Sequence, residues 1–221
     1  MNKIIKCILI DLDGTILNSG PDLLDSLNYA LERQNLKPIN DKVIGKLVGG
    51  GAGAMIEKAY SHLGLKLPNN KIDIIINDFL KFYYDNCTNK SSIYPGVIET
   101  IKNLKTKYKI CICTNKKQRL TERILQKLNI DNLFDIIVGS SSNLKLKPDS
   151  EMLSYIIKKL NIITKEAVMI GDSSNDIIPA KNLGIKTIFV TYGYGNLNPE
   201  LKADYNVNKF SEVIKCLDSK S

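Results

Sequence analysis

The chain has 221 residues, 43% of them hydrophobic, and a formal net charge of +8. This length suffices for one sizeable core, or for a core with a small inserted domain, and the composition is typical of a globular protein. The positive charge could indicate a nucleic-acid or membrane partner. However, the basic residues are nearly all Lys, scattered along polar helix faces without interleaved aromatic residues, so we expect neither partner. A positive field would instead help to attract a small anionic substrate.

The N-terminal apolar run, residues 4–10, predicts a buried strand. It is too short for a membrane span, is broken by Lys6 and ends in acidic residues, so we expect it to be neither a signal peptide nor a membrane span and the protein to be cytoplasmic. The five cysteines lack the spacing of a disulfide framework and are expected to be reduced thiols. The only histidine, His62, is expected to be an ordinary helix residue.

The acidic turn Asp11-Leu12-Asp13-Gly14-Thr15 follows directly on this first strand. Asp11 and Asp13 alternate past Leu12, so both carboxylates can point into one crevice and share a divalent cation if the strand persists that far. Gly14 then lets the backbone turn away. Two acids beyond the carboxyl end of a parallel strand lie where open α/β sheets usually place their chemistry. A strand end followed by an Asx turn is the structural alternative.

A long helical stretch separates the first strand from the second, which is predicted to start near Lys109. Apolar spacing predicts a helix from Pro21, a short helix over residues 43–47 that Asp41 could cap, and helices over 55–63 and 71–86. The glycine-rich segment 49–53 lies between the second and third of these. The four helices are too much chain for one crossover, so we expect a small helical domain over residues 17–90, inserted into a core domain made of residues 1–16 and 91–221.

Downstream of the insert, helices and strands alternate. Helices are predicted over residues 96–107, 117–128, 149–160 and 175–183, and strands over 109–113, 135–138, 167–170 and 186–190. This alternation predicts an α/β fold with a doubly wound parallel sheet, similar to a Rossmann fold.

Three further polar clusters follow short apolar stretches in this half of the chain. Thr114 and Asn115 follow the second strand, Lys147 precedes Pro148, and Asp172 and Asp176 follow the strand over 167–170. Considered singly, these residues could be helix caps, part of a basic run, or a capped loop. Their order along the chain, however, indicates a functional role.

The four clusters together resemble the motifs of the haloacid dehalogenase superfamily of aspartate-nucleophile phosphotransferases. Those motifs are DxDx[TV], a Ser or Thr after the second strand, a Lys, and a GDxxxD acidic pair, and all four occur in order over residues 11–176. The resemblance implies that the helical insert is a cap domain. It also implies a small phosphorylated substrate and a Mg²⁺ cofactor.

The resemblance assigns roles to the motif residues of this chain. Asp11 would attack phosphorus and form an aspartyl-phosphate, while Asp13 would protonate the leaving oxygen and then activate water. The expected Mg²⁺ ligands are Asp11, Asp172 and the carbonyl oxygen of Asp13.

Four further residues would contact the phosphoryl group or hold those that do. Thr114 and Lys147 would contact the phosphoryl oxygens, with Asn115 adjacent as a further substrate-binding residue. Asp176 would hold Lys147 or the metal-bound waters from behind. We expect the phosphoryl-transfer chemistry of the superfamily because position 13 is Asp rather than a bulky aromatic residue, which disfavours carbon–halogen cleavage.

Three less specific segments are similar to those of phosphoglycolate phosphatases: residues 19–23, 48–52 and 191–195. We therefore expect a Mg²⁺-dependent phosphatase of small organic phosphate monoesters, with 2-phosphoglycolate as the leading substrate. Pyrophosphatases and β-phosphoglucomutases share much of the pattern and remain alternatives, and a non-catalytic phosphate-binding module is a more distant one. Lys42, Lys46 and the glycines of residues 49–53 are candidate specificity residues, and the sequence leaves the oligomeric state open.

Overall fold

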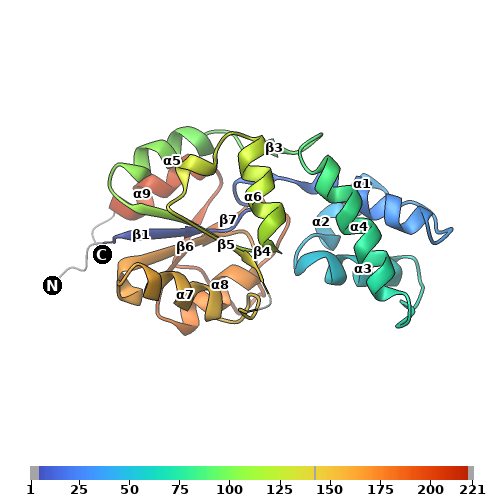
Figure 1. Cartoon of the computed structure of the whole chain (residues 1–221). Coiled ribbons are helices and arrows are strands. Elements are labelled where there is room, and N and C mark those ends of the chain that lie inside the picture. Colours follow the sequence, from blue (N-terminus) through green and yellow to red (C-terminus); the bar gives the residue numbers. More distant parts are fainter. Residues whose placement is uncertain (1–4, 142, 219–221) are drawn as a thin grey trace. The chain divides into compact units, whose positions relative to one another are not determined.

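The computed structural model describes residues 5–141 and 143–218. Parts of the predicted core domain, residues 1–4 and 219–221, and the first residue of the predicted first strand lie outside them. The chain divides into two compact units (Figure 1). One contains the chain up to Asn18 and from Ile93 onward, and the other is Ser19–Ser92.

The first unit is built on a parallel sheet of six strands in the order β5-β4-β1-β6-β7-β8. Its strands are β1 (Cys7–Ile10), β4 (Lys109–Lys117), β5 (Ile136–Ser140), β6 (Ala167–Gly171), β7 (Lys186–Val190) and β8 (Tyr205–Val207). β1 pairs with β4 on one side and with β6 on the other. β4 and β5 are added on one side of β1, and β6, β7 and β8 are then added on the other side. This reversal creates a topological switch point between β1 and β6.

Helices cover both faces of this sheet, α5 and α6 on one and α7 and α8 on the other (Figure 1). They are α5 (Val97–Lys105), α6 (Gln118–Lys127), α7 (Glu151–Lys159) and α8 (Ser174–Asn182), and α9 (Val213–Asp218) follows β8. This arrangement confirms the predicted doubly wound α/β fold. The strands are buried on both faces, so they are continuous apolar runs rather than alternating ones.

The core beneath α7 shows how the sequence positions the strands. Leu9 of β1 and Met169 of β6 lie in one cluster with Met152, Leu153 and Ile156 of α7, and all are fully buried. Cys7, Cys111 and Cys113 belong to the same cluster and behave as small apolar side chains. All five cysteines are free thiols, as the sequence predicts.

The second unit is helical. It contains α1 (Gly20–Glu32), a 3₁₀ turn at Asp41–Val43, α2 (Ile44–Leu47), α3 (Gly51–His62) and α4 (Ile72–Asn86). α1 packs on α4 and α3 packs on α4, through buried apolar residues that include Leu27, Ile56 and Phe79. A two-stranded sheet of β2 (Leu17–Asn18) and β3 (Ser92–Ile93) lies where the chain passes between the units. Whether this helical unit acts as a cap stays a prediction.

Several local expectations need correction. The cap of the 3₁₀ turn is Asn40, not Asp41, because Asn40 has extended backbone dihedrals and its side chain accepts a hydrogen bond from the Lys42 amide. β4 continues to Lys117, so α6 begins only at Gln118. β8 and α9 are absent from the sequence-based prediction, because elements this short carry too few residues for a recognisable period.

Candidate active site

The predicted motif residues of the sheet meet at its carboxyl edge, beside the switch point. Asp11 follows β1 directly, Asp172 follows β6, and Thr114 lies on β4, which pairs with β1. Since carboxyl ends of neighbouring parallel strands lie at one edge, residues more than a hundred positions apart become neighbours.

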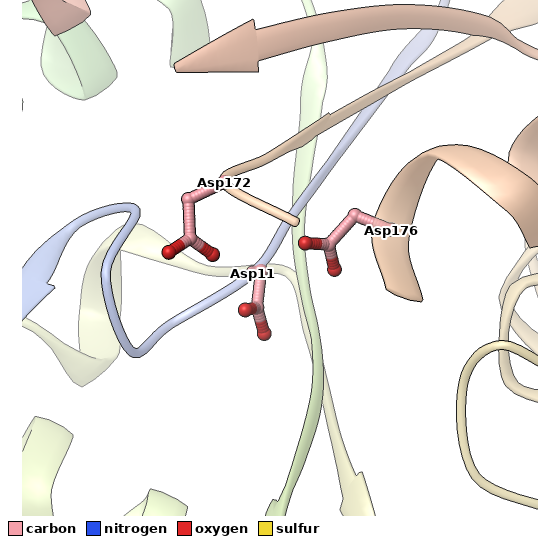
Figure 2. Close-up of side chains that lie close together, drawn as sticks. All are labelled: Asp11, Asp172 and Asp176. Carbon is pink, nitrogen blue, oxygen red and sulfur yellow. The ribbon is translucent and has the colours of Figure 1, made fainter. Parts of the chain in front are cut away.

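Three carboxylates converge there. Oxygen atoms of Asp11, Asp172 and Asp176 all lie within 4.8 Å of one another, and all three residues are buried (Figure 2). Oδ1 of Asp11 is buried without a regular hydrogen bond, although the Lys147 ammonium lies 3.0 Å away as an ion-pair partner. Hard, closely spaced carboxylate oxygens of this kind fit a divalent cation such as Mg²⁺ or Ca²⁺.

Lys147 is the only cation that contacts this triad among the described ion pairs. Its ammonium lies 2.5 Å from Oδ1 of Asp176, 3.0 Å from Oδ1 of Asp11 and 2.6 Å from the carbonyl oxygen of Cys113. When all three carboxylates are ionised, the single ammonium leaves two uncompensated negative charges, a balance that suits a bound divalent cation.

The pKa values of Asp172 and Asp11 reflect this imbalance. Burial, then the charges of Asp176 and Asp11, raise the pKa of Asp172 to about 8, despite two backbone hydrogen bonds that favour its ionised form. Burial also raises the pKa of Asp11 to about 6, with Lys147 opposing the shift. Burial lowers the pKa of Lys147, but the attraction of Asp11 and Asp176 outweighs it and the net shift is upward, so this lysine stays charged.

Asp176 holds Lys147 from the start of α8. One of its oxygens accepts from Lys147, and the other accepts from both the backbone amide and the hydroxyl of Ser173, at 3.1 and 2.9 Å. Both oxygens are therefore engaged by the protein. Asp172 differs, because its two hydrogen bonds, from the amides of Tyr194 and Gly195, both engage Oδ2. This contrast makes Asp11 and Asp172 better direct ligands than Asp176.

Glycines make room for these acids. A Cβ atom on Gly14 would lie 2.2 Å from Oδ2 of Asp172, and one on Gly171 would lie 2.2 Å from Cγ of Asp176. Gly14 also has a φ of +83°, which other residues rarely adopt. The glycines of the first and fourth motifs are therefore required by the close approach of the acids.

Thr114 and Asn115 lie in an irregularity of β4 rather than at a helix start. The register between β4 and β5 shifts between Cys113 and Lys117, as in a β-bulge. Thr114 is buried, and its hydroxyl oxygen accepts from the Lys116 amide. The Asn115 amide donates to the carbonyl oxygen of Lys147 at 2.7 Å and accepts from its N–H at 2.9 Å. This pairing favours a role for Asn115 in holding Lys147 over direct contact with substrate.

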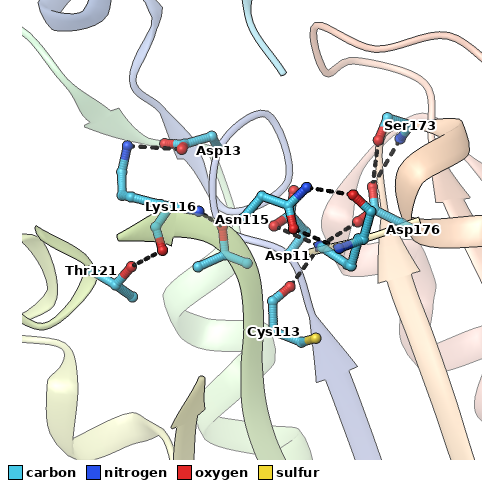
Figure 3. Close-up of polar contacts among 10 residues, drawn as sticks. Asp11, Asp13, Cys113, Asn115, Lys116, Thr121, Ser173 and Asp176 are labelled. Carbon is cyan, nitrogen blue, oxygen red and sulfur yellow. Dashed lines mark hydrogen bonds and ion pairs between the residues drawn. The ribbon is translucent and has the colours of Figure 1, made fainter. Parts of the chain in front are cut away.

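Asp13 does not join the acidic triad. Its Oδ2 lies 2.8 Å from the ammonium of Lys116, a nearly buried side chain (Figure 3). The idea that the carboxylates of Asp11 and Asp13 share one cation is therefore not what the structure shows, because the chain turns after Asp11 and Lys116 engages the second acid. A metal contact through the Asp13 carbonyl stays a prediction.

The loop after β7 supports the site in a way that the sequence did not reveal. Besides the amides that bind Asp172, the Tyr192 hydroxyl donates to the carbonyl oxygen of Thr15 at 2.7 Å, and the Tyr194 hydroxyl donates to the Asn18 side chain. Residues 191–195 suggest only a resemblance, and Lys116 lies in a run of basic residues that does not distinguish it from its neighbours. Neither position carries a pattern that marks such contacts.

The haloacid dehalogenase-like hydrolase family model matches residues 8–190, a span that contains all four motifs. The chain belongs to this family. Similar relatives include the phosphoglycolate phosphatase of Mesorhizobium japonicum, 37% identical over 96% of this chain and 91% of that protein. That of Haemophilus influenzae strain 86-028NP is 34% identical over 98% of this chain and 100% of that protein.

A solved structure has the same fold over nearly the whole chain. The crystal structure of a predicted phosphoglycolate phosphatase from Haemophilus somnus 129pt has a TM-score of 0.87 and 31% identity, covering 96% of this chain and 97% of that one. The family assignment makes this chain a hydrolase. Within residues 5–141 and 143–218, no helix combines the length and hydrophobicity needed to cross a membrane.

Proposed function

We propose that this protein is a Mg²⁺-dependent phosphatase that hydrolyses small phosphate monoesters through an aspartyl-phosphate, with 2-phosphoglycolate as the leading substrate. The observation that carries the proposal is the buried cluster of Asp11, Asp172 and Lys147 at the switch point, in a chain similar to phosphoglycolate phosphatases along almost its full length. Mg²⁺, held by Asp11 and Asp172, would neutralise phosphoryl charge and align it for attack.

The chain's own residues would divide the reaction into two displacements. The Asp11 carboxylate attacks phosphorus, forming an aspartyl-phosphate as the bond to the leaving oxygen breaks, and Asp13 gives that oxygen a proton. Water then attacks the phosphoenzyme, Asp13 takes its proton, and inorganic phosphate leaves with Asp11 restored. Thr114 and Lys147 would contact the phosphoryl oxygens, and Asp176 and Asn115 would keep Lys147 in place.

The glycines of residues 49–53 have a structural explanation as well as a functional one. Gly49, Gly50 and Gly51 all have positive φ values, at the point where α3 begins. Their conformation alone therefore accounts for glycine there. A role in recognising a small carboxylate remains part of the proposal, together with Lys42 and Lys46.

The test is a panel of esters assayed with saturating Mg²⁺: 2-phosphoglycolate, p-nitrophenyl phosphate, a hexose phosphate and pyrophosphate. We expect the highest kcat/KM for 2-phosphoglycolate, and a leading hexose phosphate or pyrophosphate would refute that substrate. Asp11→Asn should form no phosphoenzyme and lose turnover, whereas full turnover in excess EDTA would refute the metal requirement. A need for a sugar bisphosphate activator would instead identify a phosphomutase.

A further inference from the structure

A second buried lysine lies beside the candidate site, outside the four motifs. The side chain of Lys116 is only 5% exposed, and its ammonium lies 2.8 Å from Oδ2 of Asp13 (Figure 3). Lysine is almost never this buried unless it is paired, because desolvation of an ammonium costs several kcal/mol. The ion pair of Lys116 and Asp13 therefore differs from an ordinary surface ion pair.

The two buried lysines separate the two acids of the first motif. Lys147 lies beside Asp11 and Asp176, while Lys116 lies beside Asp13. The negative charge of the Asp13 carboxylate repels that of Asp11, which lies two residues away in the chain. An ammonium on the far side of Asp13 both compensates this charge and draws the carboxylate away from the acidic triad.

The backbone fixes the direction from which Lys116 approaches. Lys116 lies within the register shift of β4, and its amide donates to the Thr114 hydroxyl oxygen at 3.3 Å. The next residue, Lys117, ends the strand with an exposed side chain. If the register of β4 shifted by one residue, Lys117 would take the position of Lys116. The bulge therefore determines which of the two lysines pairs with Asp13.

We infer that Lys116 is a positioning residue that holds the Asp13 carboxylate toward the leaving-group oxygen and out of the metal-binding cluster. The inference rests on the proposed function, in which Asp13 transfers that proton. A compact ammonium serves this purpose because it attracts one carboxylate oxygen without imposing the paired geometry of a guanidinium.

The test compares Lys116→Met with the matched exposed control Lys117→Met, using 2-phosphoglycolate and p-nitrophenyl phosphate under saturating Mg²⁺. p-Nitrophenolate leaves with little help from an acid, whereas an alkoxide needs a proton. Lys116→Met should therefore lower kcat for 2-phosphoglycolate by about 10- to 100-fold and have a several-fold smaller effect on p-nitrophenyl phosphate. Lys117→Met should match the wild type, and Mg²⁺ affinity, measured calorimetrically, should be retained in both variants.

A double-mutant cycle with Asp13→Asn decides whether Lys116 acts through Asp13. If it does, adding Lys116→Met to Asp13→Asn should change kcat little further, because the shared effect is already lost. Additive losses, equal losses for both esters, or a higher KM at unchanged kcat would each overturn the inference, the last by making Lys116 a substrate ligand. Wild-type turnover and its loss in Asp11→Asn test the proposed function separately.

Discussion

At the scale of single residues, the acidic triad places like charges in a buried site. Asp172 accepts two backbone hydrogen bonds, yet burial and the nearby Asp176 and Asp11 raise its pKa to about 8. A carboxyl with a raised folded-state pKa stabilises the fold least when it is ionised. Without metal, stability should therefore fall as the pH rises from the unfolded value, near 4, through about 8.

We predict that Asp172→Asn makes the metal-free protein less sensitive to pH. In excess EDTA, the free energy of unfolding of the wild type should fall by about 1–3 kcal/mol between about pH 5 and pH 9. Asp172→Asn should lose less, because its amide oxygen can still accept from Tyr194 and Gly195 without carrying charge. Urea denaturation at a series of pH values measures both.

Added Mg²⁺ provides the control for this prediction. It should raise the free energy of unfolding of the wild type at about pH 8 and have much less effect on Asp172→Asn, since a ligand stabilises only the state that binds it. Equal stabilisation of the two proteins would exclude Asp172 from the metal site. Parallel pH profiles in EDTA would contradict the charge argument.

At the scale of elements, Asp22 joins the start of the helical unit to its end. This residue of α1 is 1% exposed and accepts hydrogen bonds from the Lys90 amide, the Ser91 amide and the Ser91 hydroxyl, at 2.9, 2.8 and 2.5 Å. One buried carboxylate thus satisfies three donors in the segment that follows α4. Residues 19–23 suggested a family resemblance, and this contact supplies a structural reason for the acid at position 22.

We predict that Asp22→Ala lowers the free energy of unfolding by about 2–4 kcal/mol, because the N–H groups of Lys90 and Ser91 lose a charged acceptor. Asp25→Ala is the matched control. Asp25 lies on the same helix and pairs with the Lys90 ammonium at 2.6 Å, but both side chains are 40% exposed or more. Its loss should cost less than about 1 kcal/mol. Urea denaturation compares them, and equal losses would contradict the special role of Asp22.

At the scale of the whole molecule, the net charge of +8 is a property of the entire surface rather than of the site. Within the site the balance is reversed, since the described triad has more carboxylates than ammonium groups. A positive long-range field with a locally acidic centre suits a metal enzyme with an anionic substrate. The field raises the encounter rate, while binding depends on the site itself.

We therefore predict that kcat/KM falls with ionic strength more steeply for 2-phosphoglycolate than for a phosphate ester of an uncharged alcohol. The extra carboxylate increases the charge product with the protein, and ions screen this attraction over about 10 Å at about 0.1 M. Initial rates from about 0.02 to 0.5 M salt, at fixed free Mg²⁺, give the two slopes. If kcat fell in parallel, salt would be acting on the site instead.

Local patterns in the sequence predicted most of the strands and helices and the acidic cluster. The apolar runs predicted every strand of the six-stranded sheet except β8. The acids after β1 and β6 predicted an acidic cluster at the carboxyl edge of the sheet, because parallel strands bring such ends together. The periodic apolar residues of α1 and α4 predicted helices in the inserted segment. These features depend on neighbours in the sequence, so the sequence alone carries their signal.

The partners of individual polar groups depended on tertiary structure. Asp13 pairs with Lys116 outside the acidic triad, and Asn115 binds the backbone of Lys147, because a bulge in β4 sets where each side chain lies. Short-range patterns do not encode a bulge or the approach of a distant loop such as that of Tyr192. The sequence by itself thus determined the kinds of group at the site, while only folding decided which group compensates which charge, since that depends on contacts between residues far apart in the chain.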